Sequence, residues 1–223
     1  MIAMILAAGR GERLRPLTDS VPKPLIEVAG ESLLERHLRM LARTGIENVV
    51  VNVSWLGEQI IERIGDGHRF GLHVTFSPEF DGVLGTGGGI QRALPMLGSE
   101  PFWVINSDVY ITMDLPDIRL ESGVTAHVLL VPTPEFKSQG DFDLENGKLA
   151  NGEHPEFTFS GIALYRPEFF SQLSRGPSSS VPLLRSGADA GKISASMLEG
   201  TWEDVGTPER LESVRQAHEK ANA

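Results

Sequence analysis

The sequence predicts an α/β protein built on a mostly parallel sheet. In the first 110 residues, apolar runs of strand length alternate with segments of helical periodicity, in the order strand, helix, strand, helix, strand, helix, strand. This alternation is typical of a doubly wound, Rossmann-like sheet with helices on both faces. After residue 110, strand-like runs follow one another closely. We expect an antiparallel extension of the same fold there.

Each element of the first part is supported by its own pattern. In the helix expected at 31–45, four leucines lie on one face and Gly45 closes the last turn. Further helices are expected at 54–65 and 87–97, and strands at 1–8, 48–53, 72–77 and 102–109. Ligands of open parallel sheets bind beyond the carboxyl ends of the strands. Polar residues at these strand ends are therefore candidate site residues.

The second part reads as closely spaced strands with a helix at its end. Strands are expected at 124–132, 141–150, 157–165 and 201–206, and 175–182 reads as a surface loop. The stretch ENGK at 145–148 is a hairpin turn signal. A final helix is expected at 207–221, with Thr207 as its N-cap and Pro208 at its first position.

Composition excludes several classes of protein. The chain has no cysteine, which excludes disulfides, a thiolate nucleophile and a cysteine metal site and fits a reducing, cytoplasmic compartment. The apolar start MIAMILAA has no preceding basic region and is too short to span a bilayer, so it predicts a strand and no membrane association. The net charge is −10, and a nucleic-acid-binding surface is not expected.

Positive charge gathers in one segment of this acidic chain. Residues 9–25 contain three arginines and Lys23 but only two acidic residues. A basic loop directly after a predicted buried strand indicates a small anionic ligand held at one place.

The loop after the first strand is rich in glycine but matches neither common phosphate fingerprint. A dinucleotide fold requires G-x-G-x-x-G, whereas Leu14 follows Gly9 and Gly11 at the last position, and no G-K-S/T is present. Glycines after a strand still let backbone N–H groups approach phosphate oxygens, and Arg13 follows as a forked cation. The alternative is a plain turn with solvated arginines.

The longer pattern favours a ligand site. LAAGRGERLRPLT at 6–18, followed by PKPL at 22–25, resembles the signature of the sugar-1-phosphate nucleotidyltransferases, although the family often has Gly-Gly at Ala8-Gly9. The resemblance implies a nucleotidyltransferase fold, similar to the GT-A fold, and an enzyme. It also implies that Arg13 holds the pyrophosphate part of a nucleoside triphosphate and that Lys23 reaches the α-phosphate or the sugar phosphate. The implied nucleotide contacts in this loop are Leu6, Ala7, Ala8, Gly9 and Gly11.

Further motifs extend the resemblance. SPEFDGVLGTGGG at 77–89 is similar to the family's base-selecting segment, which implies base contacts at Glu79, Thr86 and Gly87. FWVINSDV at 102–109 implies a nucleotide contact at Asn106 and a Mg²⁺ ligand at Asp108, since Mg²⁺ prefers hard oxygen ligands.

The metal site and the sugar site depart in part from related patterns. Related enzymes carry D-x-D where this chain has Asn-Ser-Asp, so a second Mg²⁺ ligand must come from elsewhere; the W-x-D-V-G-T motif implies Asp204. On the sugar side, QGDF and FTFSGIALY imply contacts at Asp141 and Gly161. The Glu-Lys-Pro segment of glucose-specific relatives is absent, which argues against a plain glucose-1-phosphate enzyme.

The resemblance covers nearly the whole chain and extends to the short bacterial N-acetylmuramate-1-phosphate uridylyltransferases of cell-wall recycling. It implies one domain over 1–223, with a nucleotide-binding half at 1–110 and a sugar-binding half at 111–223. The expected reaction combines UTP with a sugar-1-phosphate to give a UDP-sugar and pyrophosphate, with Mg²⁺ as cofactor. We expect a monomer. Alternatives are GTP with mannose-1-phosphate, UTP or dTTP with glucose-1-phosphate, CTP with phosphocholine, or a non-catalytic nucleotide-binding regulator.

Overall fold

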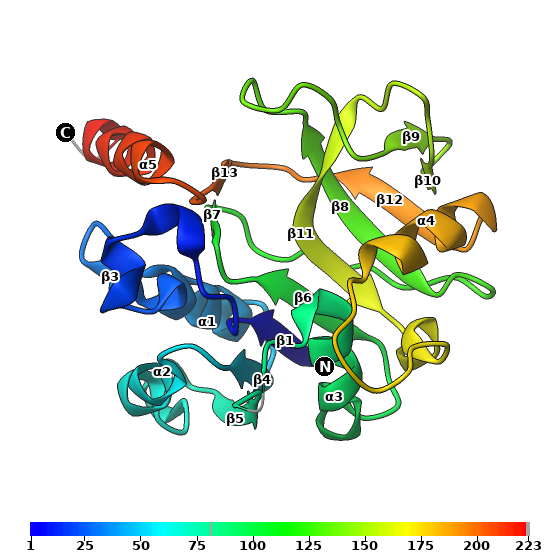
Figure 1. Cartoon of the computed structure of the whole chain (residues 1–223). Coiled ribbons are helices and arrows are strands. Elements are labelled where there is room, and N and C mark those ends of the chain that lie inside the picture. Colours follow the sequence, from blue (N-terminus) through cyan, green and yellow to red (C-terminus); the bar gives the residue numbers. More distant parts are fainter. Residues whose placement is uncertain (81, 222–223) are drawn as a thin grey trace. The chain divides into compact units, whose positions relative to one another are not determined.

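The computed structural model describes residues 1–80 and 82–221, with side chains through residue 219. It is an α/β protein, as the sequence predicts (Figure 1). The chain forms two compact units. The first comprises Met1–Val83, Asn106–Leu115 and Gly200–Ala223, and the second comprises Leu84–Ile105 and Pro116–Glu199.

The first unit is built on three parallel strands. They are β1 (Ile2–Leu6), β4 (Asn48–Val53) and β5 (His73–Pro78), in the order β5-β4-β1. Their register aligns Ile2 with Asn48 and Asn48 with His73. Two helices alternate with the strands, α1 (Leu33–Arg43) and α2 (Gly57–Ile64). These three strands and two helices are confirmed: β4 has its predicted bounds, β5 is shifted by one residue, and β1, α1 and α2 are slightly shorter than their predicted ranges.

The expected strand at 102–109 is two strands. β6 (Phe102–Asn106) ends before Ser107, and β7 (Val109–Ile111) begins after Asp108. Ser107 and Asp108 form a turn between the two strands, and the N–H of Ser107 donates to the carbonyl of Leu6 (3.1 Å), at the end of β1. β7 pairs antiparallel with β13 (Trp202–Asp204), the core of the strand expected at 201–206.

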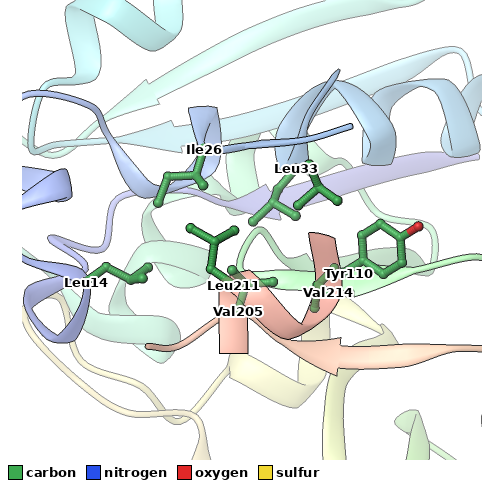
Figure 2. Close-up of a cluster of buried hydrophobic side chains, with 8 residues drawn as sticks. Leu14, Ile26, Leu33, Tyr110, Val205, Leu211 and Val214 are labelled. Atoms are coloured by element: carbon green, nitrogen blue, oxygen red, sulfur yellow. The ribbon is translucent and has the colours of Figure 1, made fainter. Parts of the chain in front are cut away.

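The last helix of the first unit packs on its beginning. α5 (Pro208–Ala221) is capped by Thr207, whose Oγ1 accepts from the N–H of Arg210 (3.4 Å), as predicted. A cluster of buried apolar side chains joins the basic loop, the start of α1 and α5 (Figure 2): Leu14, Ile26, Val28, Leu33, Tyr110, Val205, Leu211 and Val214. The small hairpin of β2 (Glu27–Val28) and β3 (Glu31–Ser32) was not predicted.

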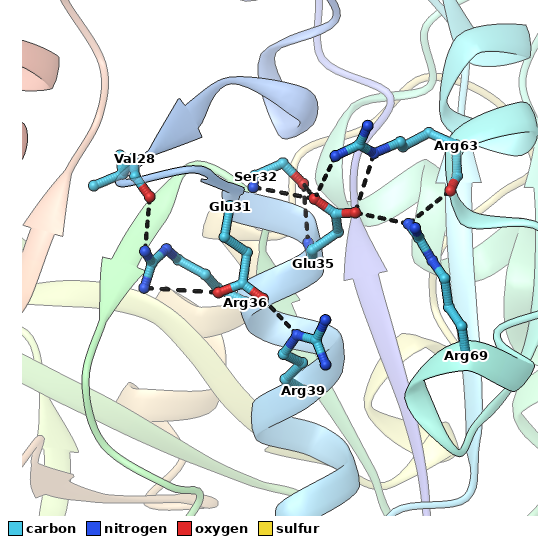
Figure 3. A network of polar contacts seen from close by, with 8 residues as sticks. All are labelled: Val28, Glu31, Ser32, Glu35, Arg36, Arg39, Arg63 and Arg69. Carbon is cyan, nitrogen blue, oxygen red and sulfur yellow. Dashed lines mark hydrogen bonds and ion pairs between the residues drawn. The ribbon is translucent and has the colours of Figure 1, made fainter.

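A buried carboxylate ties α1 to the segments beside it (Figure 3). Glu35 forms a capping box with Ser32 at the start of α1 and also accepts hydrogen bonds from Arg63 (3.1 Å) and Arg69 (2.7 Å). Burial raises the pKa of Glu35, but the hydrogen bonds from Arg63 and Ser32 outweigh burial and lower the pKa to about 2. Glu35 is therefore ionised at neutral pH and holds α1, α2 and the turn after α2 together.

The second unit carries the antiparallel strands. β11 (Phe157–Tyr165) pairs antiparallel with β6 and with β8 (Ala126–Pro132), and β9 (Asp143–Glu145) forms a hairpin with β10 (Lys148–Ala150). β12 (Ile193–Met197) runs parallel to β8. α3 (Gly85–Leu97) is confirmed, whereas α4 (Val181–Asp189) and β12 were not predicted.

The two units differ from the halves expected at 1–110 and 111–223. The cause is that the segment from Gly200 onward belongs to the first unit, where β13 pairs with β7 and α5 packs against the basic loop. The single domain and its two functional halves stay predictions. Among the described residues, no helix has the length and apolar character needed to cross a membrane.

Candidate active site

The carboxyl ends of the parallel strands are tied together by one buried amide. Asn52, at the end of β4, accepts the N–H of Ala7 (2.7 Å) and donates to Oε1 of Glu79 (2.8 Å), directly after β5. Both Asn52 and Glu79 are buried. The glycine loop therefore leaves β1 in a fixed direction. Glu79 lies at this strand edge, with its carboxylate on Asn52.

Two glycines shape the loop for different reasons. Gly11 has a φ of +68°, and a Cβ there would lie 3.0 Å from Cγ2 of Thr18, whose hydroxyl donates to the Gly11 carbonyl (2.9 Å). The fold itself thus requires glycine at position 11. At Gly9, by contrast, a Cβ would meet no atom within 4 Å, and φ is not in the left-handed region. The fold therefore does not require glycine at position 9 by either criterion, and a nucleotide contact there stays a prediction.

The loop opens onto a cavity of about 510 Å³ in the first unit. Three cations and two carboxylates line it, and within residues 1–80 and 82–219 neither Arg10 nor Arg13 forms an ion pair. Two guanidinium groups without a counter-ion in one cavity suit a multiply charged anion. The lining residues are Gly9, Arg10, Gly11, Glu12, Arg13, Lys23, Val83, Asp108 and Gly206.

The third cation is held by a carboxylate. The ammonium of Lys23 lies 2.7 Å from Oδ2 of Asp108, and the Lys23 side chain is 9% exposed whereas that of Asp108 is 34% exposed. The break between β6 and β7 places Asp108 in the cavity. Because this pair is neutral as a whole, the two arginines outweigh Glu12 and leave the cavity lining with one excess positive charge.

Asp204 lies beside Asp108 on the neighbouring strand. Asp204 aligns with Val109 across β13 and β7, and the N–H of Val205 donates to the Asp108 carbonyl (2.9 Å). Oδ2 of Asp204 accepts a hydrogen bond from Arg210 (2.6 Å). A Cβ on Gly206, which lines the cavity, would lie 2.6 Å from Oδ1 of Asp204 and 3.1 Å from Arg13. Asp204 and Arg13 therefore both approach Gly206 at the cavity wall.

These two carboxylates fit a magnesium ion. Mg²⁺ commonly takes one or two protein carboxylates and fills its other positions with water and substrate phosphates. Among the described residues, no group of three or more histidine, cysteine, aspartate or glutamate side chains is placed to hold a metal. Magnesium binding by Asp108 and Asp204 stays a prediction, with water and substrate phosphates as the other ligands.

Thr86 and Gly87 lie in the second unit and contact the segment at 178–180. The hydroxyl of Thr86 is 3.0 Å from both the N–H and the hydroxyl of Ser180, and the N–H of Gly87 donates to the Ser178 carbonyl (3.0 Å). A Cβ on Gly87 would lie 3.0 Å from the Ser179 carbonyl. The close approach of this segment accounts for the glycine at 87. Base contacts at Thr86 and Gly87 stay predictions.

The two predicted sugar contacts also lie in the second unit. Both carboxylate oxygens of Asp141 are 2.8 Å from the ammonium of Lys137, and Oδ2 accepts the N–H of Phe159 (3.1 Å). Gly161 has a φ of +81° and lies where the register of β11 against β8 shifts. Asp141 is thus fixed to β11, and sugar binding by either residue stays a prediction.

Among the predicted site residues, the structure brings Gly9, Gly11, Arg13, Lys23 and Asp108 to one cavity, with Asp204 at its wall. Leu6 ends β1, Ala7 and Ala8 follow it as buried residues, and Asn106 ends β6 two residues before Asp108. Sequence reasoning did not assign site roles to Arg10, Glu12, Val83, Gly206 or Arg210. Arg10 and Glu12 lie in the glycine-loop motif, Val83 in the segment at 77–89 and Gly206 in the W-x-D-V-G-T motif, whereas Arg210 lies in no motif.

Comparisons with known proteins agree with this geometry. Residues 2–134 match the family model described as Nucleotidyl transferase. The chain is 42% identical to the N-acetylmuramate alpha-1-phosphate uridylyltransferase of Neisseria meningitidis serogroup B, covering 96% of this chain and 97% of that one. Identity to the enzyme of the same name from Caulobacter vibrioides is 33%, over 93% of each chain.

A solved structure supports the fold. A Bacillus anthracis protein classed as a glucose-1-phosphate thymidylyltransferase superposes with a TM-score of 0.85, over 97% of this chain and 95% of that one, at 21% sequence identity. At this identity the likeness concerns the fold alone. The family match and the two relatives decide the assignment: the chain belongs to the nucleotidyl transferase family and is a sugar-1-phosphate nucleotidyltransferase.

Proposed function

We propose that the protein transfers the uridylyl group of UTP to N-acetylmuramic acid 1-phosphate, giving UDP-N-acetylmuramic acid and pyrophosphate. The observation that carries the proposal is the cavity at the end of β1, where Arg13, Lys23 and Asp108 lie together. The choice of substrates is supported by the names of the two relatives that match over nearly the whole chain. We place the reaction in cell-wall sugar recycling in the cytoplasm.

The reaction needs no protein nucleophile. A phosphate oxygen of the sugar phosphate attacks the α-phosphorus of UTP in line. One phosphorus–oxygen bond forms there, the bond to the bridging oxygen of the β-phosphate breaks, and pyrophosphate leaves. The groups that react are all negatively charged, so catalysis consists of positioning them and neutralising their charge.

Arg13 and Lys23 have separate tasks in this proposal. Arg13, which forms no ion pair among the described residues, neutralises the leaving pyrophosphate with its planar set of donors. Lys23 is a point charge that draws the attacking phosphate and the α-phosphate together against their repulsion. Its pairing with Asp108 fixes its position before substrates bind.

Asp108 and Asp204 would hold Mg²⁺ at the cavity wall. When bound, the ion would supply positive charge that stabilises the negative charge on phosphate oxygens. The remaining nucleotide contacts proposed are Leu6, Ala7, Ala8, Gly9, Gly11, Glu79, Thr86, Gly87 and Asn106, and the sugar contacts are Asp141 and Gly161. We further propose a monomer without a nucleic-acid or membrane partner.

The test is pyrophosphate release from UTP and Mg²⁺ with a panel of sugar 1-phosphates: N-acetylmuramic acid, N-acetylglucosamine, glucose and mannose. The proposal expects release with the muramic sugar far above the others. Release with a different sugar, or only after UTP is replaced by GTP, dTTP or CTP, would overturn the substrate assignment and keep the phosphate chemistry. No Mg²⁺-dependent release with any pair would overturn the proposed activity.

A further inference from the structure

We infer that Arg10 is a further phosphate-binding residue of the cavity and that Trp55 is the positioning residue that holds its guanidinium. The inference rests on the proposed function, because it assigns Arg10 to the phosphates of the nucleotide in the same cavity. Arg10 stands between Gly9 and Gly11 and lines the cavity. Its guanidinium carbon lies 4.1 Å from the centre of the Trp55 ring.

The stacking restrains the guanidinium without using its hydrogen-bond donors. The donors of a guanidinium lie in its plane, whereas contact with an indole uses its face. An arginine held in this way presents N–H groups to an anion and loses less side-chain freedom when the anion binds. Arg10 is thus pre-organised for a phosphate before the phosphate arrives.

Trp55 is itself fixed to the loop that carries Arg10. Its indole N–H donates to the carbonyl of Thr18 (2.9 Å), and the buried hydroxyl of Thr18 donates to the carbonyl of Gly11 (2.9 Å). In the first turn of α2, the amide of Gln59 donates to the carbonyl of Ser20 (3.1 Å). The start of α2 is therefore attached to Thr18 and Ser20, and Thr18 is in turn attached to Gly11.

The backbone directly after Trp55 adopts a conformation that is unfavourable for a residue with a side chain. Leu56 has a φ of 52° and a ψ of 29°, the left-handed conformation that a residue with a side chain rarely adopts. The turn at Leu56 lets α2 begin directly after the indole. With right-handed helical dihedral angles at Leu56, the chain would enter α2 in a different direction. The Trp55 side chain would then lie elsewhere.

Arg10 and Arg15 lie on the same loop but differ in their ion pairing. Arg15 forms an ion pair with Asp19 (2.8 Å) and does not line the cavity. Arg10 forms no ion pair within the described part of the chain. The two residues carry the same charge on one loop, so Arg15 is a matched control for long-range electrostatic effects.

The first experiment compares UTP binding by Arg10→Met and Arg15→Met, measured by calorimetry with Mg²⁺ and no sugar phosphate. Loss of a charge-assisted hydrogen bond predicts a Kd about tenfold higher for Arg10→Met, and a change of less than about twofold for Arg15→Met. Inorganic tripolyphosphate, used as a second probe, should show the same difference. Equal Kd values for the two variants would overturn the role of Arg10.

The second experiment tests whether Trp55 acts through Arg10. In a double-mutant cycle, Trp55→Leu should weaken UTP binding in the wild-type background and have no further effect in the Arg10→Met background. Trp55→Phe keeps an aromatic face and should bind UTP more tightly than Trp55→Leu, and it provides the comparison if Trp55→Leu does not fold. Additive effects would overturn the positioning role.

The outcomes separate this inference from the proposed function. If the wild-type protein binds neither UTP nor tripolyphosphate, the proposed function fails. If the wild type binds UTP and Arg10→Met binds it equally well, only the role of Arg10 fails.

Discussion

The ammonium of Lys23 and the carboxylate of Asp108 lie 2.7 Å apart, although 85 positions of sequence separate them. One residue comes from the loop after β1 and the other from the break between β6 and β7. In the proposed function, this pair joins the part of the cavity that would bind the phosphates to the part that would hold the metal. Changes to either residue should therefore impair turnover more than folding.

We expect Lys23→Met to lower kcat/KM for UTP by roughly 10²–10³, by analogy with the removal of one preorganised oxyanion donor. The reason is that no other cation of the cavity replaces a buried ammonium at this position. The measurement is steady-state pyrophosphate release, with thermal unfolding recorded for the same samples. Lys192→Met removes an exposed lysine of the second unit and is the control. Activity of Lys23→Met near that of Lys192→Met would contradict the role of Lys23.

We expect Asp204→Asn to raise the Mg²⁺ concentration required for half-maximal activity by about tenfold or more. Asparagine keeps an oxygen that can accept the hydrogen bond from Arg210, so the change removes charge from a carboxylate whose oxygen faces Gly206. A Mg²⁺ titration of initial rates measures the effect. Asp114→Asn is a matched control, since Asp114 also pairs with an arginine, Arg43, in the first unit. A parallel shift in both variants would argue against Asp204 as a ligand.

We expect Gly9→Ala to impair UTP binding and Gly11→Ala to impair stability. Alanine at position 9 meets open space and should leave the free energy of unfolding unchanged while weakening UTP binding. Alanine at position 11 requires a φ of +68° and lies 3.0 Å from Thr18, so it should lower the free energy of unfolding by about 1–2 kcal/mol. Urea unfolding and calorimetric UTP binding distinguish the two. A Gly9→Ala variant that binds UTP normally would show that the ligand does not approach this backbone.

We expect the free energy of unfolding to depend on pH because of Glu35. Its pKa is about 2 in the folded protein against 4.5 as the ordinary value. Because the folded pKa is the lower one, the stabilisation is complete above about pH 5 and is lost as the pH falls from there toward 2. At about 1.36 kcal/mol per pKa unit, the contribution at neutral pH is at most about 3 kcal/mol.

The Glu35 prediction is tested by urea unfolding of Glu35→Gln at pH 7 and at pH 3. The difference from wild type should be large at pH 7 and clearly smaller at pH 3. Glu31→Gln, which affects an exposed pair with Arg39, should change stability little at either pH. A Glu35→Gln defect of the same size at both pH values would show that packing, and not charge, is lost.

The sequence was sufficient for the elements whose pattern is local. The leucine face of α1, the apolar runs of β1 and β4, and the Thr207-Pro208 start of α5 each carry their signal within a few residues, and each is confirmed. The turn at Ser107 and Asp108 is not predicted, because the apolar run from Phe102 to Val109 has the length and composition of one strand and contains no glycine or proline to mark a break.

Some residues of the candidate site could be predicted from sequence motifs, and others could be found only in the structure. The motif residues Gly9, Gly11, Arg13, Lys23 and Asp108 were named from sequence, and they line one cavity. Gly206 belongs to the W-x-D-V-G-T motif and Arg210 to no motif, and the contacts of both with Asp204 appear only in the folded structure. The glycines of α3 carried a motif signal that packing against Ser178 also explains, so sequence alone could not separate the two causes.

The segment from Gly200 onward belongs to the first unit although it is the last part of the chain to be synthesised. The wall at Gly206 and the apolar cluster around Leu211 are translated about a hundred residues after Asp108. A nascent chain that already contains the glycine loop, Lys23 and Asp108 therefore lacks part of the cavity that would hold the triphosphate. A product of premature termination before Trp202 has neither Asp204 nor that wall, so it should not sequester nucleotide in competition with the finished enzyme.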